Sequence, residues 1–555
     1  MNVSRRDFMK SAGLLGAGAA AAFVAGCSPA DTATSKSESM DASATGNSNL
    51  AVSGDDYKAA PDPIPADQIS EIIDADVVVV GLGNAGTFAA LTAAEEGARV
   101  VVLQKGEGVY CNGTASSWPK STVLDADGHN FDAWQIVNDV QRGLNCNRGD
   151  TKLWRNWVRY GEEIANWWIP KANAHEDVGP VLGEVALFGP NAAQADDDNK
   201  FNEYYLTAHV PMGASMSGNQ PTQMVNTALL EDALADGADI NVLDKTPAVQ
   251  LVTSENGAVT GAIGQRETGE YVRVNAERGV ILCTGGYANN PQMRHEYCEH
   301  LDVIPAAQAE KYDTGDGILM GLWAGGAIQP GPHCGAVHYD PGIGVPNYLG
   351  AVVPWLRVNV EGERFCNEDM GYALISMQDI QQPEAIHFQV FDDNYATDID
   401  FMGQGTQFGV WKDFIPQALE AGDLCVGNTV EELAESMGVP ADALSATVNR
   451  YNELAEAGYD EDFGKQKSRL KPIVKAPFYA LKRRPSVLAT MNGLLVDEDY
   501  RVLNENRVPI EGLFATGNDS GGMFGGIQYP MNIPGISVGR ALMSGRIAAW
   551  RAMGK

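Results

Sequence analysis

Basic residues are scarce in this 555-residue chain. It has 39 lysines and arginines against 72 aspartates and glutamates, which gives a formal net charge of −33. A protein that binds nucleic acid needs a basic surface to displace counterions from the phosphates, so no nucleic-acid partner is expected. The acidic excess by itself indicates good solubility and no particular ligand.

Cysteines spaced for a metal or a haem are also lacking. The eight cysteines include no C-x-x-C pair, and no such pair precedes a histidine. Iron–sulfur clusters and covalently attached haems are therefore not expected, and no metal site is predicted. Electrons for any redox chemistry would have to come from outside the chain.

The apolar run near the N-terminus is too short to cross a membrane. Leu14 to Ala25 is about a dozen residues long, and a spanning helix needs about 20. The run follows Ser4-Arg5-Arg6-Asp7-Phe8, and together they resemble a twin-arginine export signal. Val24-Ala25-Gly26-Cys27 resembles a lipoprotein processing site, with Cys27 as the lipidated residue. Residues 1–27 are predicted to be this signal; the alternative is a chance arginine pair on a short helix.

Residues 28–71 are predicted to be a flexible linker. They are rich in Ser, Ala, Thr, Asp and Pro and lack apolar periodicity. Signal and linker together predict export, either to the outer face of the cytoplasmic membrane as a lipoprotein or to the periplasm. Contact with the membrane is expected only through a lipid on Cys27.

The segment from Asp74 to Lys105 predicts a βαβ unit that binds a dinucleotide. An apolar run leads into Gly81-Leu82-Gly83-Asn84-Ala85-Gly86, a helical pattern follows, and Val100 to Leu103 forms a second strand. Gly81 permits the tight turn, Gly83 lets a pyrophosphate approach the backbone, and Gly86 lets the helix pack on the strand. The N–H groups at the start of the helix are then available to the phosphates.

One position in this unit departs from the usual pattern. The residue that closes the second strand ordinarily carries a carboxylate for the adenosine ribose, and here it is Gln104. Its amide oxygen can still accept a hydrogen bond, but without charge assistance. Weaker binding on this side is expected, unless another group compensates.

Five motifs together resemble the fumarate reductase and succinate dehydrogenase flavoprotein superfamily, which includes ketosteroid dehydrogenases. They are GLGNAG at Gly81, CTGG at Cys283, TGDG at Thr314, GERFCNE at Gly362 and GLFATGN at Gly512. The resemblance implies an α/β fold with a Rossmann-like FAD-binding domain, residues 72–329 and 487–555, and an inserted α+β capping domain, residues 330–486. It implies FAD contacts at Gly81, Gly83, Gly86, Gln104, Lys105, Thr114, Ser117, Thr284, Gly285, Asp316, Asn518, Gly535 and Ser537.

The substrate side departs from the fumarate reductase pattern. The family's proton-donating arginine after GERFCNE falls at or near Tyr372, its histidine near Ala489, and its carboxylate-clamping arginine near Tyr529-Pro530. A dicarboxylate needs paired cationic donors in a dry site, so fumarate is not the expected substrate. Tyr529-Pro530 instead resembles part of the ketosteroid dehydrogenase pattern, with Met531 where glycine would follow.

These departures nominate three catalytic residues. Tyr372 is the candidate proton donor, and the alternative is a packed aromatic residue. Tyr529 is the candidate for polarising a substrate carbonyl. His338 lies where the resemblance implies a substrate-binding histidine, and His333 is its competitor. Arg364 and Glu368 are expected to be an ion-paired scaffold.

The predicted function is an exported FAD-dependent oxidoreductase that reduces an activated C=C bond of an enoate, enone or aromatic acrylate. Hydride would come from flavin N5, and electrons from a membrane-associated cytochrome or a quinol-linked protein, as in a respiratory reductase. The alternatives are a ketosteroid-type dehydrogenase, or a flavin electron-transfer protein with no substrate of its own.

Overall fold

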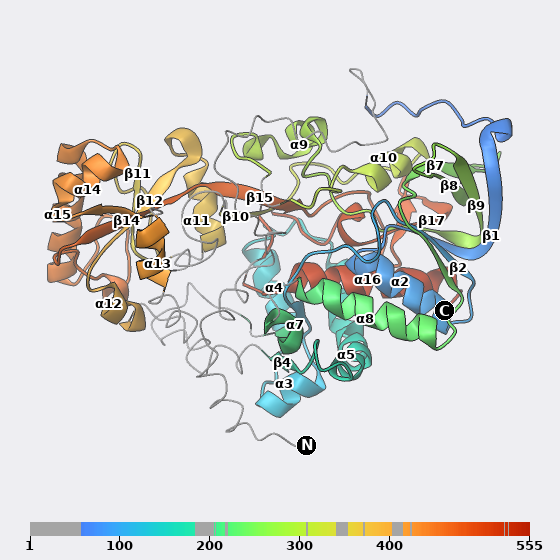
Figure 1. Ribbon diagram of the computed structural model, residues 1–555, viewed down its shortest axis with the longest axis horizontal. Coiled ribbons are helices and arrows are strands. Elements are labelled where there is room, and N and C mark those ends of the chain that lie inside the picture. The colour runs from blue at the N-terminus through green and yellow to red at the C-terminus, as the bar shows by residue number, and fades with distance from the viewer. Residues whose placement is uncertain are drawn as a thin grey trace.

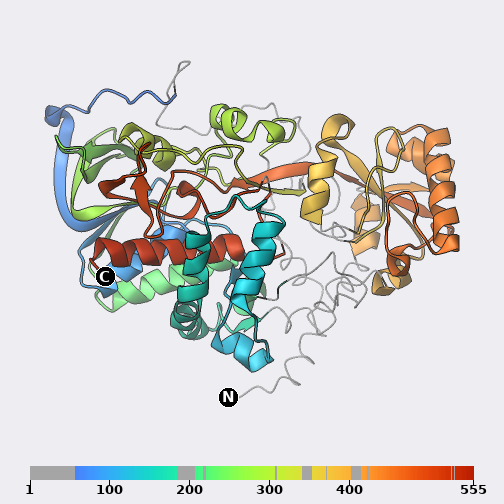
Figure 2. The ribbon, with the colours of Figure 1, turned by 180° about the vertical axis from the view of Figure 1, so that it is seen from behind.

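The computed structural model describes residues 57–183, 205, 207–216, 220–306, 309–339, 353–369, 372–401, 414–421, 424–526, 528–530 and 532–555. The predicted export signal and Cys27 lie outside these residues. None of the described helices is both long and apolar enough to cross a membrane. The chain forms a larger and a smaller lobe (Figures 1 and 2).

The larger lobe is built on a mainly parallel sheet with the strand order β16-β17-β9-β1-β2-β6. β1, β2, β6, β9 and β17 run parallel, and β16 is an antiparallel edge. The four valines at the end of β1, from Val77 to Val80, are buried, as expected for a strand covered on both faces. The bounds are β1 (Ile69–Val80), β2 (Val100–Leu103), β6 (Ile240–Leu243), β9 (Tyr271–Leu282), β16 (Arg501–Leu503) and β17 (Pro509–Ala515), with the antiparallel pair β7 (Ala248–Thr253) and β8 (Val259–Gln265) joined to β9.

Four helices gather on one side of this sheet (Figure 1). They are α2 (Asn84–Glu95), α5 (Thr151–Asn173), α8 (Pro221–Ala235) and α16 (Ile536–Ala552). α2 and α16 pack so closely that a Cβ on Gly545 would lie 2.1 Å from the carbonyl oxygen of Ala85. Glycine in α16 therefore lets the last helix lie directly against the first.

Shorter elements complete the larger lobe. Aspartate side chains begin two of its helices, because Asp132 and Asp150 accept hydrogen bonds from the first free N–H groups of α4 and α5. The bounds are α3 (Thr122–Asp127), α4 (Ala133–Arg142), α7 (Met212–Met216), α9 (Pro291–Cys298) and α10 (Asp316–Trp323), with a three-stranded sheet of β3 (Ser116–Ser117), β5 (Ala208–Pro211) and β4 (Val181–Gly183).

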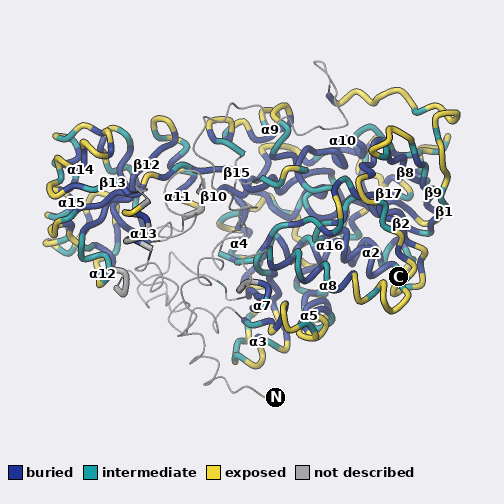
Figure 3. The backbone as a smooth tube through the Cα atoms, in the orientation of Figure 1, coloured by how far each residue is buried: buried dark blue, intermediate teal, exposed yellow. Residues whose placement is uncertain are grey.

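The smaller lobe is an α+β unit with its own apolar interior, so the predicted fold class is confirmed. Its antiparallel sheet has the order β11-β12-β14-β13, and its buried residues form two clusters separate from the core of the larger lobe (Figure 3). The bounds are β11 (Leu356–Asn359), β12 (His387–Asp392), β13 (Cys425–Gly427), β14 (Phe478–Arg483), α11 (Tyr372–Asp379), α12 (Tyr395–Phe401), α13 (Phe414–Ala421), α14 (Val430–Met437) and α15 (Ala441–Ala457).

Two antiparallel strands join the lobes. The chain leaves the larger lobe along β10 (Gly335–Tyr339) and returns along β15 (Pro485–Thr490). Figure 1 shows β15 extending from the smaller lobe to the centre of the molecule. The predicted capping domain, 330–486, contains β10 and the whole small sheet, and its limits stay a prediction.

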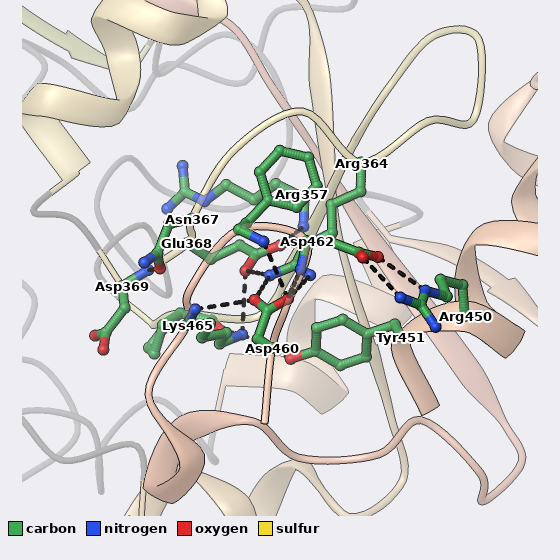
Figure 4. A network of polar contacts seen from close by, with 12 residues as sticks. Arg357, Arg364, Asn367, Glu368, Asp369, Arg450, Tyr451, Asp460, Asp462 and Lys465 are labelled. Carbon is green, nitrogen blue, oxygen red and sulfur yellow. Dashed lines mark hydrogen bonds and ion pairs between the residues drawn. The ribbon is translucent and has the colours of Figure 1, made fainter. Parts of the chain in front are cut away.

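Buried charges hold the smaller lobe together (Figure 4). Arg364 donates to both carboxylate oxygens of Glu368, each at 2.8 Å, and to Asp460 at 2.7 Å. The Lys465 ammonium lies 3.4 Å from the second oxygen of Glu368. The predicted ion pair within GERFCNE is therefore confirmed, and its position inside the smaller lobe agrees with a scaffolding role.

The structure differs from the predicted linker at residues 57–71. Tyr57 is buried and hydrogen-bonds to Glu296, and the Ile64 N–H donates to Gln250 Oε1 at 3.0 Å. β1 already begins at Ile69, where it pairs with Tyr271 of β9. Pairing with β9 orders this polar segment, which its composition alone could not predict.

Candidate active site

One large cavity lies at the carboxyl ends of the parallel strands. Its walls come mainly from residues 80–85, 103–105, 110–115, 283–285, 516–518, 534–538 and 541, and its empty volume is about 1740 Å³ with the open solvent at its mouth included. These segments follow β1, β2, β9 and β17, the edge of an open α/β sheet at which ligands characteristically bind. The N-termini of α2 and α16 both meet this cavity, since Asn84 and Gly535 line it.

The glycine loop has the shape that a pyrophosphate requires. A Cβ on Gly81 would lie 2.4 Å from the Cys283 carbonyl oxygen, and one on Gly86 would lie 2.0 Å from that of Gly81. These two glycines are needed by the fold itself. A Cβ on Gly83 would meet nothing closer than 3.5 Å, yet Gly83 lines the cavity. The fold therefore does not require glycine at position 83. A ligand that lies against the backbone does require it, so the loop fits a dinucleotide.

Gln104 and Lys105 both line the cavity beyond the end of β2. Gln104 Oε1 accepts from the Leu82 N–H at 3.2 Å, and its Nε2 donates to the Gly108 carbonyl at 2.8 Å. The glutamine thus fastens the glycine loop to the segment after β2. The Lys105 ammonium pairs with Asp316 at 2.9 Å, so these two predicted contacts are joined in the cavity wall.

The other predicted cofactor residues separate into two groups. Thr114, Thr284, Gly285, Asn518, Gly535 and Ser537 line the cavity. Ser117 does not; it is fully buried behind the wall, and its hydroxyl lies 2.8 Å from that of Thr207. Gly86 also lies outside the lining, where it packs α2 against β1. The structure therefore assigns Ser117 to the support of the wall.

Sequence reasoning missed two buried carboxyl groups here. Asp313 lines the cavity, and burial raises its pKa to about 7. Asp519 accepts hydrogen bonds from the N–H and, at 2.9 Å, from the hydroxyl of Thr284, and burial raises its pKa to about 8. Both adjoin recognised motifs, Asp313 before TGDG and Asp519 after GLFATGN, so they could have been singled out.

The cavity wall brings together two of the three catalytic candidates. His338 of β10 and Tyr529 both line it, next to Leu488, Ala489 and Met491. The Tyr529 N–H donates to the Gly335 carbonyl at 3.3 Å, which fixes this tyrosine beside the strand that carries His338. Burial lowers the pKa of His338 to about 4, so its imidazole is neutral at physiological pH.

The remaining candidates are placed differently. His333 lies outside the cavity lining, where its ring nitrogens are each 2.6 Å from the Tyr287 hydroxyl and the Gln329 carbonyl. These contacts make His333 a structural residue. Of the two candidate histidines, it is His338 that lines the cavity. Tyr372 is the first residue of α11, and its side chain lies outside the described residues, so its role stays a prediction.

Comparison with known proteins defines the class to which this fold and cavity belong. Residues 76–530 match the family described as the FAD binding domain. The chain is 31% identical to the vinyl phenol reductase of Lactiplantibacillus plantarum over 85% of this chain and 94% of the relative. It is 29% identical to the urocanate reductase of Eggerthella lenta, over 89% and 76% respectively. The solved 3-ketosteroid-Δ4-(5α)-dehydrogenase of Rhodococcus jostii is 25% identical with a TM-score of 0.67, covering 89% of this chain and all of that one.

The chain therefore belongs to the FAD binding domain family, among the flavoproteins that resemble fumarate reductases and ketosteroid dehydrogenases. It is a FAD-dependent oxidoreductase that acts on CH–CH groups. The predicted superfamily and cofactor are confirmed. The twin-arginine signal, the lipid on Cys27, the location and the electron donor stay predictions.

Proposed function

We propose that this protein reduces the C=C bond of a neutral substrate in which the double bond is conjugated to a carbonyl or a phenol. The observation that carries the proposal is the charge of the cavity. Among the described residues that line it, the only basic side chain is Lys105, and Asp316 already pairs with it. A dicarboxylate would lack the paired cations that desolvation demands.

Tyr529 and His338 are suited to polarising such a substrate. Both line the cavity wall, and burial keeps His338 neutral. A tyrosine hydroxyl and a neutral imidazole are each hydrogen-bond donors, suited to a carbonyl or phenolic oxygen as negative charge develops there. FAD, when bound and reduced, supplies the hydride. Tyr372, at the start of α11, is the proposed source of the proton that completes the saturated product.

The electron supply is proposed to be external. The chain has no cysteine spacing suited to a cluster or haem, and no group of three or more potential metal ligands occurs among the described residues. A membrane-associated cytochrome or a quinol-linked protein is the proposed donor. With the twin-arginine signal, this makes the protein an exported respiratory reductase. The similarity to vinyl phenol and urocanate reductases supports reduction over dehydrogenation.

A substrate panel tests the proposal. Reduced enzyme is mixed anaerobically with vinyl phenols, enones and fumarate, and flavin reoxidation is followed by absorbance. Neutral conjugated alkenes should reoxidise the flavin rapidly and fumarate should not. Bleaching of the oxidised enzyme by saturated ketones would favour the dehydrogenase, and indifference to every compound would favour the electron carrier.

Tyr529→Phe tests the site directly. Loss of one hydrogen-bond donor to developing charge lowers turnover by about 10²–10³-fold. The matched control is Tyr500→Phe, since Tyr500 is also buried but lies outside the cavity lining. Both variants should keep the flavin spectrum, and full turnover by Tyr529→Phe would refute the assigned role.

A further inference from the structure

A buried arginine lies directly behind the cavity wall. Arg540 is in the second turn of α16, and its exposed fraction is 1%. Its guanidinium donates to the carbonyl oxygens of Met491 at 3.1 Å and Ser520 at 3.3 Å, and to the side-chain oxygen of Asn518. Met491 and Asn518 line the cavity, as do Ser537 and Ala541 on the same helix. One layer of residues therefore separates this charge from the cavity.

No described neighbour neutralises the charge of Arg540. Among the described residues, no carboxylate forms an ion pair with it, and its other close partner is the ring of Phe524, 5.0 Å from the guanidinium carbon. Burial lowers its pKa to about 10, which still leaves it positive at neutral pH. A buried cation is expensive unless it is paired, so its retention without a carboxylate indicates an electrostatic use.

The hydrogen bond to Asn518 also orients that side chain. Because Oδ1 of Asn518 accepts from Arg540, the amide nitrogen is left as the group that can face the cavity. The N-terminus of α16 adds its partial positive charge at the same wall, where Gly535 and Ser537 lie. Arginine, asparagine and helix all present positive potential to one part of the cavity.

We propose that Arg540 is a positioning residue that raises the reduction potential of the bound FAD. Its buried charge, relayed by Asn518, stabilises the negative charge that the cofactor gains on reduction. A higher potential makes the cofactor easier to reduce by the external donor. The inference rests on FAD binding in this cavity and is independent of the proposed substrate.

The second buried arginine of α16 provides a matched control. Arg546 is also buried, but it pairs with Glu95 at 3.2 Å and with the Thr92 hydroxyl at 3.0 Å, away from the cavity lining. Cys334 provides an independent variant. It is fully buried, lies outside the lining, and a negative charge on it would act on Arg540, so Cys334→Asp can neutralise the guanidinium without removing it.

The test is redox titration of the purified holoprotein without substrate. Arg540→Gln should bind reduced FAD about tenfold less favourably relative to oxidised FAD, which lowers the midpoint potential by about 30 mV for a two-electron couple. Cys334→Asp should lower it similarly, while Arg540→Lys, Cys334→Ser and Arg546→Gln should leave it unchanged. An unchanged potential in Arg540→Gln, or an equal fall in Arg546→Gln, would overturn the proposal.

Cys334→Asp decides the question if Arg540→Gln does not retain FAD. A potential equal to that of Cys334→Ser would then refute an electrostatic role. Because no alkene takes part, failure here leaves the substrate proposal untouched. Conversely, if no alkene of the panel reoxidised the flavin but Arg540→Gln still lowered the midpoint potential, the proposed substrate would be wrong and the role of Arg540 would stand.

Discussion

Burial controls the titration of individual side chains throughout this molecule. His209, His333 and His338 are each enclosed, and burial lowers the pKa of each to about 4. Asp313 and Asp519 are shifted the other way, to about 7 and about 8. Burial shifts the pKa of each of the five towards its neutral form, so at pH 7 the three histidines are neutral and the two carboxyl groups are less ionised than exposed aspartates.

The histidine shifts predict how stability responds to acid. An unfolded histidine has a pKa of about 6.5, so between about pH 6.5 and 4 the unfolded chain binds the extra proton and each buried histidine makes stability fall as pH falls. His333→Gln removes one histidine that takes up a proton only on unfolding. The free energy of unfolding of this variant should therefore depend less steeply on pH than that of the unmodified protein, by about 1.4 kcal/mol per pH unit.

Urea unfolding of His333→Gln and of the unmodified protein between pH 4.5 and 6 measures this difference. The control is His295→Gln, on the surface, where hydrogen bonding to Asp302 raises the histidine pKa. That shift acts above pH 6.5, so the control should leave the slope in this window unchanged. Equal slopes for all three proteins would contradict the assigned burial effect.

At the scale of the element, the glycine loop separates folding from binding. A Cβ on Gly83 meets ordinary contact distances, and its backbone, with φ −90° and ψ −160°, suits any residue. Gly83→Ala should therefore fold normally but bind FAD roughly tenfold or more weakly, about 1.4 kcal/mol for each factor of ten. Flavin fluorescence quenching by apoprotein measures the affinity.

Gly86→Ala is the paired variant with the opposite outcome. Its Cβ would collide with the Gly81 carbonyl oxygen, so the apoprotein should lose about 1–3 kcal/mol of stability, the usual cost of overpacking. Urea unfolding without FAD distinguishes the two variants. If Gly83→Ala destabilised the apoprotein as much as Gly86→Ala, the assignment of Gly83 to FAD binding rather than to folding would be wrong.

Sequence reasoning recovered the elements whose signal is local. The strand Val100–Leu103 and the loop from Gly81 to Gly86 follow from apolar runs and glycine spacing, and they appear as predicted. The pairing of β10 with β15 could not be predicted, because these strands lie far apart in the chain and neither carries a pairing signal. Arg540 was missed for the same reason, since its partners come from three other segments. Ser117 was wrongly predicted to contact FAD for a different reason. A sequence motif indicates that a segment lies near the cofactor, but it does not indicate which of its side chains face the cofactor.

At the scale of the whole molecule, stability of the smaller lobe depends on its interior charges. Arg364→Met would leave Glu368 and Asp460 buried with fewer partners, so it should cost about 3–5 kcal/mol. Arg450, which pairs with Glu461 and Asp462 on the surface, provides the control in Arg450→Met. That change should barely alter stability, because these side chains are exposed and solvent already screens the pairs.

Urea unfolding, with the flavin signal followed separately, measures both variants. Loss of the smaller lobe in Arg364→Met while the larger lobe keeps FAD would also show that the two lobes unfold independently. A cost for Arg364→Met no greater than that for Arg450→Met would contradict the importance of the buried pairs.

The cavity wall is drawn from segments at opposite ends of the folded chain, the glycine loop at Gly81–Ala85 and the start of α16 at Gly535–Ala541. A ribosome therefore releases the first wall long before it synthesises the second. Until α16 has emerged and docked on α2, the nascent protein has only half a binding site to offer. The complete cavity can therefore take up FAD only after α16 has been synthesised.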